Sequence, residues 1–127
     1  MIKRFKFSMV LALLIMYLSL KNSNDFNKIQ FLNIPHFDKF AHFCMYFGLM
    51  STIILESWKA SVQKISIFVM ALFPLFYGIL MEILQATLTT TRSASLFDVL
   101  FNTIGILISI LLWLRIPFIL KEKLRSK

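Results

Sequence analysis

Long apolar stretches separated by short polar connections are the main pattern in this chain. Four such stretches occur, at residues 7–20, 38–55, 65–88 and 96–114. A helix of about 20 apolar residues crosses the hydrocarbon core of a bilayer, and the connections are too short to form a separate domain. The pattern therefore predicts one all-α membrane domain over residues 1–127, built as a bundle of four transmembrane helices.

The first apolar stretch resembles a signal peptide, because it follows a basic start. No small-x-small cleavage pattern stands at residues 19–24, so we expect an uncleaved first helix. Composition agrees with a bilayer as the solvent: hydrophobic residues make up 58% of the chain, and mean hydropathy is +0.77. Cys44 is the only cysteine, which excludes an intramolecular disulfide and a thiolate metal cage.

The formal net charge of +8 is explained by membrane topology. Basic residues cluster at the two ends of the chain and flank apolar segments, so we do not expect nucleic acid as a partner. Nine Lys and Arg residues belong to the N-terminal segment, the connection 56–64 and residues 121–127, against four on the opposite side. Positively charged loops stay in the cytoplasm, so both termini are predicted to be cytoplasmic.

Polar residues recur at helical spacing inside three of the predicted helices. Residues four apart lie on one face of a helix, one turn from each other. In this arrangement each stripe begins near the outer membrane face. The stripes are Asp38, His42 and Tyr46 in the second helix, Glu82 and Gln85 in the third, and Asp98 and Asn102 in the fourth. Gly78 and Gly105 occur on the same stripes, where small residues permit close helix contact.

Glu82 is the most informative of these residues. It lies about 9 Å below the predicted helix end, at about 1.5 Å per residue. A carboxylate at the centre of a span costs about 2.5–3.5 kcal/mol, so it is expected to face the bundle interior and find a partner. The candidate partners are Lys39, His42 and Arg92. We therefore predict an outer-leaflet polar pocket shared by three helices.

Structural roles are the alternative for each residue. Asp38 can cap the second helix, and residues 95–98 have the S-x-x-D form of a capping box. His42 and Asn102 can serve as hydrogen bonds between helices, and Glu82 as a paired packing residue. Tyr46 can be a packing aromatic, and Arg92 a solvated loop charge.

Three spaced motifs resemble the VanZ-like family of bacterial membrane proteins. Residues 38–47 read D-K-x-x-H-F-x-x-Y-F, residues 77–85 read Y-G-x-x-x-E-x-x-Q, and residues 92–105 read R-S-x-S-x-x-D-x-x-x-N-x-x-G. The resemblance covers about residues 36–112; the connection 86–91 lacks the Phe and Pro-Gly usual in the family. It implies a multi-pass protein of the bacterial plasma membrane, of the type associated with low-level resistance to the glycopeptide teicoplanin.

Our leading hypothesis is a protein that engages membrane lipids or a lipid-linked envelope precursor through the outer pocket. The alternative is a membrane-embedded hydrolase or transferase that uses acid/base pairs from Asp38, His42, Glu82 and Asp98. We expect no cofactor and assign no metal ligand, although His42 with carboxylates could hold a divalent ion. A transporter is the weakest hypothesis, because the inner halves of the spans carry almost no polar residues.

Overall fold

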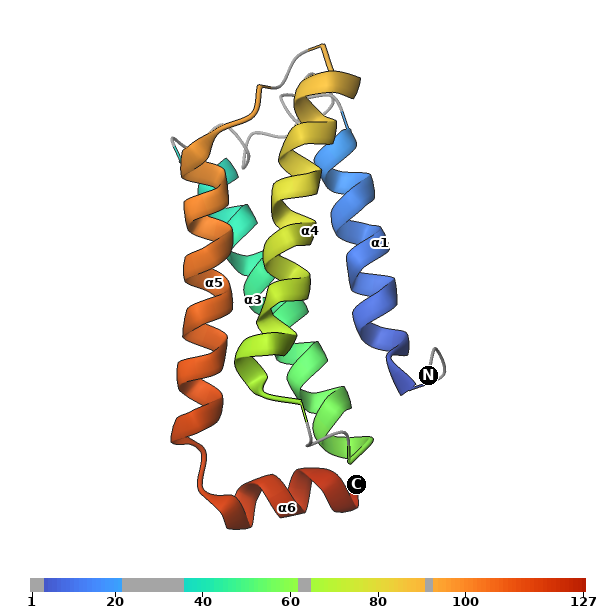
Figure 1. The fold of residues 1–127 in the computed structure, drawn as a ribbon, viewed down its shortest axis with the longest axis vertical. Helices are drawn as coiled ribbons and strands as arrows, with labels where there is room; N and C mark the ends of the chain where they lie inside the picture. Colours follow the sequence, from blue (N-terminus) through green and yellow to red (C-terminus); the bar gives the residue numbers. More distant parts are fainter. Residues whose placement is uncertain (1–3, 22–35, 62–64, 91–92) are drawn as a thin grey trace.

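A computed structural model describes residues 4–21, 36–61, 65–90 and 93–127. This part of the chain forms five helices and contains no strand, which confirms the predicted all-α class. The helices are α1 (Lys6–Leu20), α3 (Phe37–Lys59), α4 (Ile67–Leu88), α5 (Leu96–Arg115) and α6 (Phe118–Ser126). Figure 1 shows α1, α3, α4 and α5 running along the length of the molecule, with α6 lying across one end.

Three of these helices, α3, α4 and α5, are long and apolar enough to cross a membrane. Helix α1 is apolar but has only 15 residues, so the count of four spans stays a prediction. Helix α3 continues to Lys59 and includes Glu56, which the sequence pattern assigned to a connection. Helix α6 was not expected, because its nine residues mix apolar and basic side chains.

The core lies where α3 packs against its neighbours. Leu49 and Met50 of α3 are fully buried, and Ile106 and Ile110 of α5 lie against the same side. Gly105 makes this contact close: a Cβ at this position would lie 2.5 Å from the carbonyl oxygen of Phe43. Small residues let two helix backbones approach in this way, so α3 and α5 form the closest pair of the bundle.

Helix α4 carries most of its large apolar side chains on the outside of the bundle. Its buried residues are Pro74, Gly78, Met81, Glu82 and Gln85, of which only Met81 is a large apolar side chain. Its outward positions carry exposed large hydrophobic residues, including Phe68, Phe73, Phe76 and Ile83. A soluble protein would bury this surface, whereas a bilayer solvates it. On α4, small and polar residues therefore face mainly into the bundle, and large apolar residues face mainly outward.

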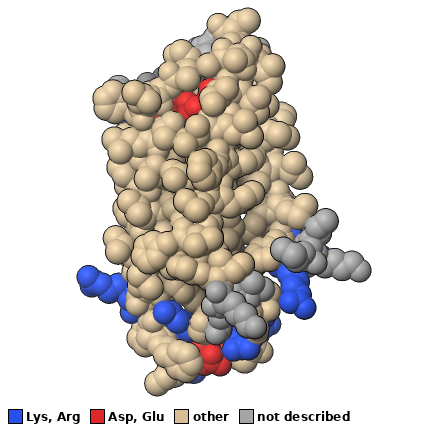
Figure 2. Space-filling view, viewed as in Figure 1, with Lys and Arg blue, Asp and Glu red and all other residues tan. Residues whose placement is uncertain are grey.

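The two ends of the molecule differ in charge. Figure 2 shows Lys and Arg gathered, beside an acidic patch, at the end of the molecule where α6 lies; near the opposite end this view shows acidic residues and no Lys or Arg. Arg115, in the last turn of α5, adds to the basic end. Trp58 and Trp113 also lie there, with ring centroids 5.6 Å apart. Tryptophan and basic residues are typical of a membrane–water interface, so the α6 end has the composition of one membrane face.

Glu56 joins α1 to α3 at this basic end. Its carboxylate accepts hydrogen bonds from the backbone N–H groups of Phe7, at 2.8 Å, and Ser8, at 3.1 Å. The Ser8 hydroxyl also donates to Glu56, and it lies 3.3 Å from the hydroxyl of Thr52. The first N–H groups of a helix have no partner within the helix, so Glu56 acts as the cap of α1 from another helix.

Candidate polar site at one end of the bundle

Three helices bring polar side chains together at the end of the bundle opposite α6. Asp38 lies in the first turn of α3 and Asp98 in the first turn of α5. Helix α4 runs antiparallel to both, so its C-terminal half, with Glu82, meets their N-terminal ends. His42, Glu82, Asp98 and Asn102 are all buried, whereas the side chain of Asp38 is 51% exposed. The group therefore extends from the surface into the bundle.

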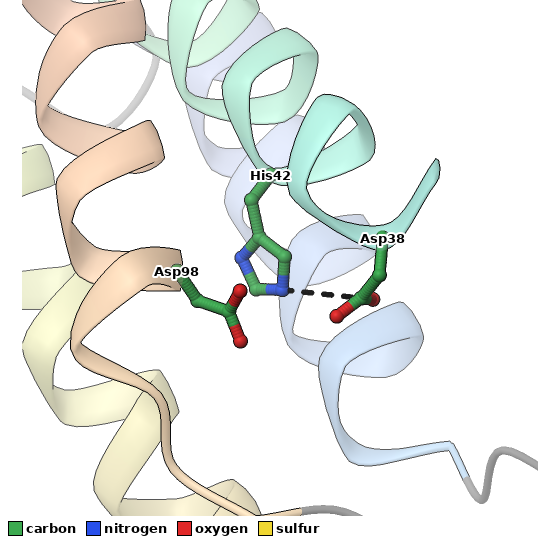
Figure 3. A group of neighbouring side chains, drawn as sticks. All are labelled: Asp38, His42 and Asp98. Atoms are coloured by element: carbon green, nitrogen blue, oxygen red, sulfur yellow. Dashed lines mark ion pairs between the residues drawn. The ribbon is translucent and has the colours of Figure 1, made fainter. Parts of the chain in front are cut away.

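His42 lies at the centre of this group. Its Nδ1 is 3.1 Å from Oδ1 of Asn102 on α5 and 3.6 Å from Oε1 of Glu82 on α4. Its Nε2 is 3.9 Å from Oδ1 of Asp38, one turn earlier on α3. Figure 3 shows the imidazole between the carboxylates of Asp38 and Asp98, which approach it from opposite sides. One histidine thus contacts polar groups of all three helices.

Both nitrogens of the imidazole face oxygen acceptors. A neutral imidazole carries one N–H and can donate on only one side. If Nδ1 donates to Asn102, then Nε2 presents its lone pair toward the carboxylate of Asp38. The imidazole therefore lies between oxygen atoms from α3, α4 and α5.

Glu82 has a second contact besides His42. Its Oε2 accepts a hydrogen bond of 3.3 Å from the backbone N–H of Ser95, the residue before α5. The Ser95 side chain makes no cap hydrogen bond, and its N–H is directed to Glu82. In a capping box this N–H would donate a hydrogen bond to the side chain of the third helical residue, here Asp98. The first residue of the S-x-x-D sequence, Ser95, is therefore hydrogen-bonded to Glu82 of the site through its backbone N–H.

Gly78 allows Tyr46 and Asn102 to pack closely below His42. A Cβ at position 78 would lie 3.1 Å from Nδ2 of Asn102 and 3.1 Å from Cε1 of Tyr46. Tyr46 and Asn102 are 1% and 2% exposed. Neither the Tyr46 hydroxyl nor Nδ2 of Asn102 has a hydrogen-bond partner among the described residues. Buried polar atoms usually have partners, so these two groups are exceptions within the described part of the structure.

Other predicted residues lie at the edge of the group or outside it. Gln85 is buried, but its Nε2 donates to the carbonyl oxygen of Ser19 and so links α4 to α1. Lys39 follows Asp38 in the first turn of α3 and is partly exposed. Arg92 lies outside the described residues. The predicted role of all these residues in binding stays a prediction.

Asp38, His42 and Asp98 have the geometry of a metal-binding group, although the sequence analysis assigned no metal ligand. One donor atom from each residue lies within 4.8 Å of the other two. Nitrogen and oxygen donors in this combination suit divalent ions such as Zn²⁺ or Mn²⁺. The contact between Nδ1 of His42 and Asn102 orients the ring so that Nε2 faces the carboxylates.

Comparison with known proteins gives one match. A model of the VanZ/LLP1 family matches residues 3–120, which extends well beyond the motifs recognised in the sequence. No curated protein and no solved structure matches the chain. Because the family model covers almost the whole sequence, the chain belongs to the VanZ/LLP1 family.

Proposed function

We propose that this protein crosses the bacterial plasma membrane four times and binds the headgroup of an amphiphile through the polar group around His42. The amphiphile is a lipid-linked envelope intermediate or a molecule of similar chemistry in the outer leaflet. The basic α6 end supports a cytoplasmic location of both termini, since positive segments stay inside. The polar group then opens toward the outer face.

The observation that carries the proposal is the set of contacts made by His42 with three helices. Asn102, Glu82 and Asp38 lie 3.1, 3.6 and 3.9 Å from its ring nitrogens. Burying carboxylates in a membrane protein is costly, and such residues mark substrate and ion sites by default. Apolar residues would fill the same space at lower cost, so a binding role explains why the group is polar.

The chemistry of the group favours a headgroup rich in hydroxyl, amide or amine groups. Three carboxylates accept hydrogen bonds, and the Tyr46 hydroxyl and Asn102 amide can donate them. Sugars and peptides offer both donors and acceptors, as lipid-linked envelope precursors do. The half-exposed Asp38 provides the first contact at the surface, and the buried groups lie one and two turns deeper.

Lipid copurification tests this function. The wild-type protein and the Glu82→Gln variant are purified from the same membranes, and bound lipids are identified by mass spectrometry. Glu122→Gln is the matched control, because Glu122 lies on α6, far from His42, with a 44% exposed side chain. We expect Glu82→Gln to lose a lipid that the wild type and the control retain. Identical lipid profiles in all three would contradict the proposal.

The proposed topology has its own test. Exposed Cys44 is first replaced by serine, and single cysteines are then introduced at Asp38, Ser93 or Lys123. A membrane-impermeant thiol reagent added to intact cells should label positions 38 and 93 and leave position 123 unlabelled. Labelling of position 123 alone would reverse the orientation. Labelling of only one of positions 38 and 93 would separate the helices that form the group.

The family resemblance further suggests a link to teicoplanin, which carries an acyl chain and so acts at membrane level. We expect expression of the wild-type protein to raise the teicoplanin concentration needed to stop growth of a sensitive host. Glu82→Gln should remove this effect, whereas Glu122→Gln should not. An unchanged concentration with the wild-type protein would contradict the link without affecting the lipid-binding test.

A metal-assisted hydrolase or transferase is the second candidate, favoured by the 4.8 Å grouping of Asp38, His42 and Asp98. These residues would hold a divalent ion, which supplies Lewis-acid chemistry at a polar headgroup. Metal analysis of the purified protein provides the test. We expect about one ion per chain in the wild type and in His36→Ala, whose histidine is exposed, and loss of the ion in folded His42→Ala. Equal metal content in the two variants would contradict this candidate.

A further inference from the structure

A cavity of about 680 Å³ lies at the α6 end of the bundle, away from the His42 group. Three basic residues line it: Arg4, Lys6 and Lys59. They come from the segment before α1, the start of α1 and the end of α3, so the fold brings distant parts of the chain to one place. All three are exposed, and their charged groups can reach a ligand without being dehydrated.

The cavity carries net positive charge. Among the described residues that line it, Glu56 is the one acidic residue, and its carboxylate accepts hydrogen bonds from the backbone N–H groups of Phe7 and Ser8. Three cations against one carboxylate leave a formal charge of +2. Glu56 is 9% exposed and its carboxylate is bound to the start of α1, so the exposed basic groups remain in excess. The cavity therefore favours an anion.

The same cavity also has an apolar wall. Phe7 of α1, Leu55 of α3 and Leu124 of α6 line it, and Phe7 is 74% exposed. An inorganic anion makes no favourable contact with apolar side chains, whereas the acyl chain of a lipid packs against them. Basic and apolar side chains in one concave surface are the combination that binds an anionic amphiphile.

Helix α6 lies beside this cavity, to which it contributes Leu124, and is fixed to the bundle. It is attached to the end of α3 by two hydrogen bonds, from Nε1 of Trp58 to the carbonyl oxygen of Lys121 at 2.8 Å and from Arg125 to Ser61 at 2.6 Å. Phe118 and Ile119 of α6 remain 67% and 72% exposed. A short helix with exposed apolar and basic residues at the end of a bundle is suited to lie in the headgroup region.

We propose that the cavity binds one anionic phospholipid, with its phosphate between Arg4, Lys6 and Lys59 and an acyl chain along Phe7 and Leu124. The site is separate from the His42 group and does not depend on the function proposed for that group. Its ligand belongs to the leaflet at the α6 end.

Lipid titration of the purified full-length protein, followed by native mass spectrometry, tests this site. The probes are phosphatidylglycerol and phosphatidylcholine with identical acyl chains, and inorganic phosphate and glycerol 3-phosphate serve as competitors. The cavity variant combines Lys6→Gln and Lys59→Gln. The matched control combines Lys123→Gln and Lys127→Gln, which removes the same charge from exposed positions that do not line the cavity.

We expect the wild type to prefer phosphatidylglycerol, and the cavity variant to bind this lipid at least about tenfold more weakly, since each interfacial lysine contributes substantially to anionic lipid binding. Binding of phosphatidylcholine should not change, and the control should bind like the wild type. Equal loss in the two variants would show diffuse surface charge and overturn the proposal. Lack of preference between the lipids, or displacement by inorganic phosphate or glycerol 3-phosphate at equal concentration, would also overturn it.

Discussion

The carboxylate of Glu56 accepts a hydrogen bond of 2.8 Å from the backbone N–H of Phe7, which lies 49 residues earlier in the chain. With the N–H of Ser8 as a second donor, this contact ties the start of α1 to α3. Helix α1 has no cap from its own sequence, because Phe5 offers no side-chain acceptor. The stability of α1 therefore depends on a residue of another helix.

We predict that Glu56→Ala destabilises the protein by about 1–3 kcal/mol, because it removes a charged acceptor from the part-buried N–H of Phe7 and the buried N–H of Ser8. Thermal unfolding in detergent, followed by the fluorescence of the two tryptophans, measures the effect. Glu56→Gln keeps an acceptor oxygen, so it should lower the melting temperature less than Glu56→Ala does. Equal melting temperatures for the wild type and Glu56→Ala would show that the cap does not stabilise α1.

A methyl group at Gly105 should be far more damaging than one at Gly48. At position 105 the added Cβ meets the Phe43 carbonyl oxygen at 2.5 Å and the Phe47 nitrogen at 3.0 Å, and these backbone atoms cannot move without separating the helices. At position 48 it meets only Cδ2 of Leu11 at 3.5 Å, an ordinary contact. We expect Gly105→Ala to lower the free energy of unfolding by at least about 1–3 kcal/mol. Gly48→Ala should leave it almost unchanged. Similar melting temperatures for the two variants would contradict the close α3–α5 contact.

Much of the fold follows from local sequence pattern. Long apolar runs predicted α3, α4 and α5, because a bilayer requires such runs and a soluble core does not. Helical periodicity also placed Asp38 and His42 one turn apart. In the structure Oδ1 of Asp38 lies 3.9 Å from Nε2 of His42. The three spaced motifs pointed to the family that the family model then confirmed.

Contacts between helices could not be derived in the same way. The role of Glu56 depends on which face of α3 meets α1, and the partner of Gln85 is a carbonyl oxygen of Ser19 in α1. Spacing within one helix does not determine which neighbour each face meets. One usable signal was overlooked: Thr52 and Glu56 are four residues apart, so they form a polar stripe that extends the helix beyond residue 55.

The contact between His42 and Asn102 should appear as a coupling free energy. In a double-mutant cycle with His42→Ala and Asn102→Ala, we expect a coupling of about 0.6–1.7 kcal/mol, the range of hydrogen bonds between membrane helices. Melting temperatures and the free energy of unfolding in detergent provide the measurement. Thr103→Ala is the control for α5, because its hydroxyl bonds to Val99 of its own helix. A cycle of His42→Ala with Thr103→Ala should show no coupling; equal coupling in both cycles would contradict a direct contact.

The attachment of α6 to the bundle depends on Trp58, and this dependence can be measured. Trp58 donates a hydrogen bond of 2.8 Å to the carbonyl oxygen of Lys121, and its ring also contacts Trp113 and Phe118 edge to face. Trp58→Phe keeps an aromatic ring but removes the donor, so the Lys121 carbonyl loses its partner on α3. We expect faster amide hydrogen exchange throughout α6, with exchange in α4 unchanged, because a helix of nine residues is not stable without tertiary contacts.

Trp113→Phe is the matched control for this change, since it alters one ring of the same cluster and leaves the hydrogen bond to Lys121 in place. Exchange in α6 should then stay close to the wild type. If both variants increased exchange equally, ring packing would hold α6 and the Trp58 donor would not. If neither did, α6 would be held by Arg125, whose Nη2 lies 2.6 Å from the hydroxyl of Ser61, and Arg125→Gln should release it.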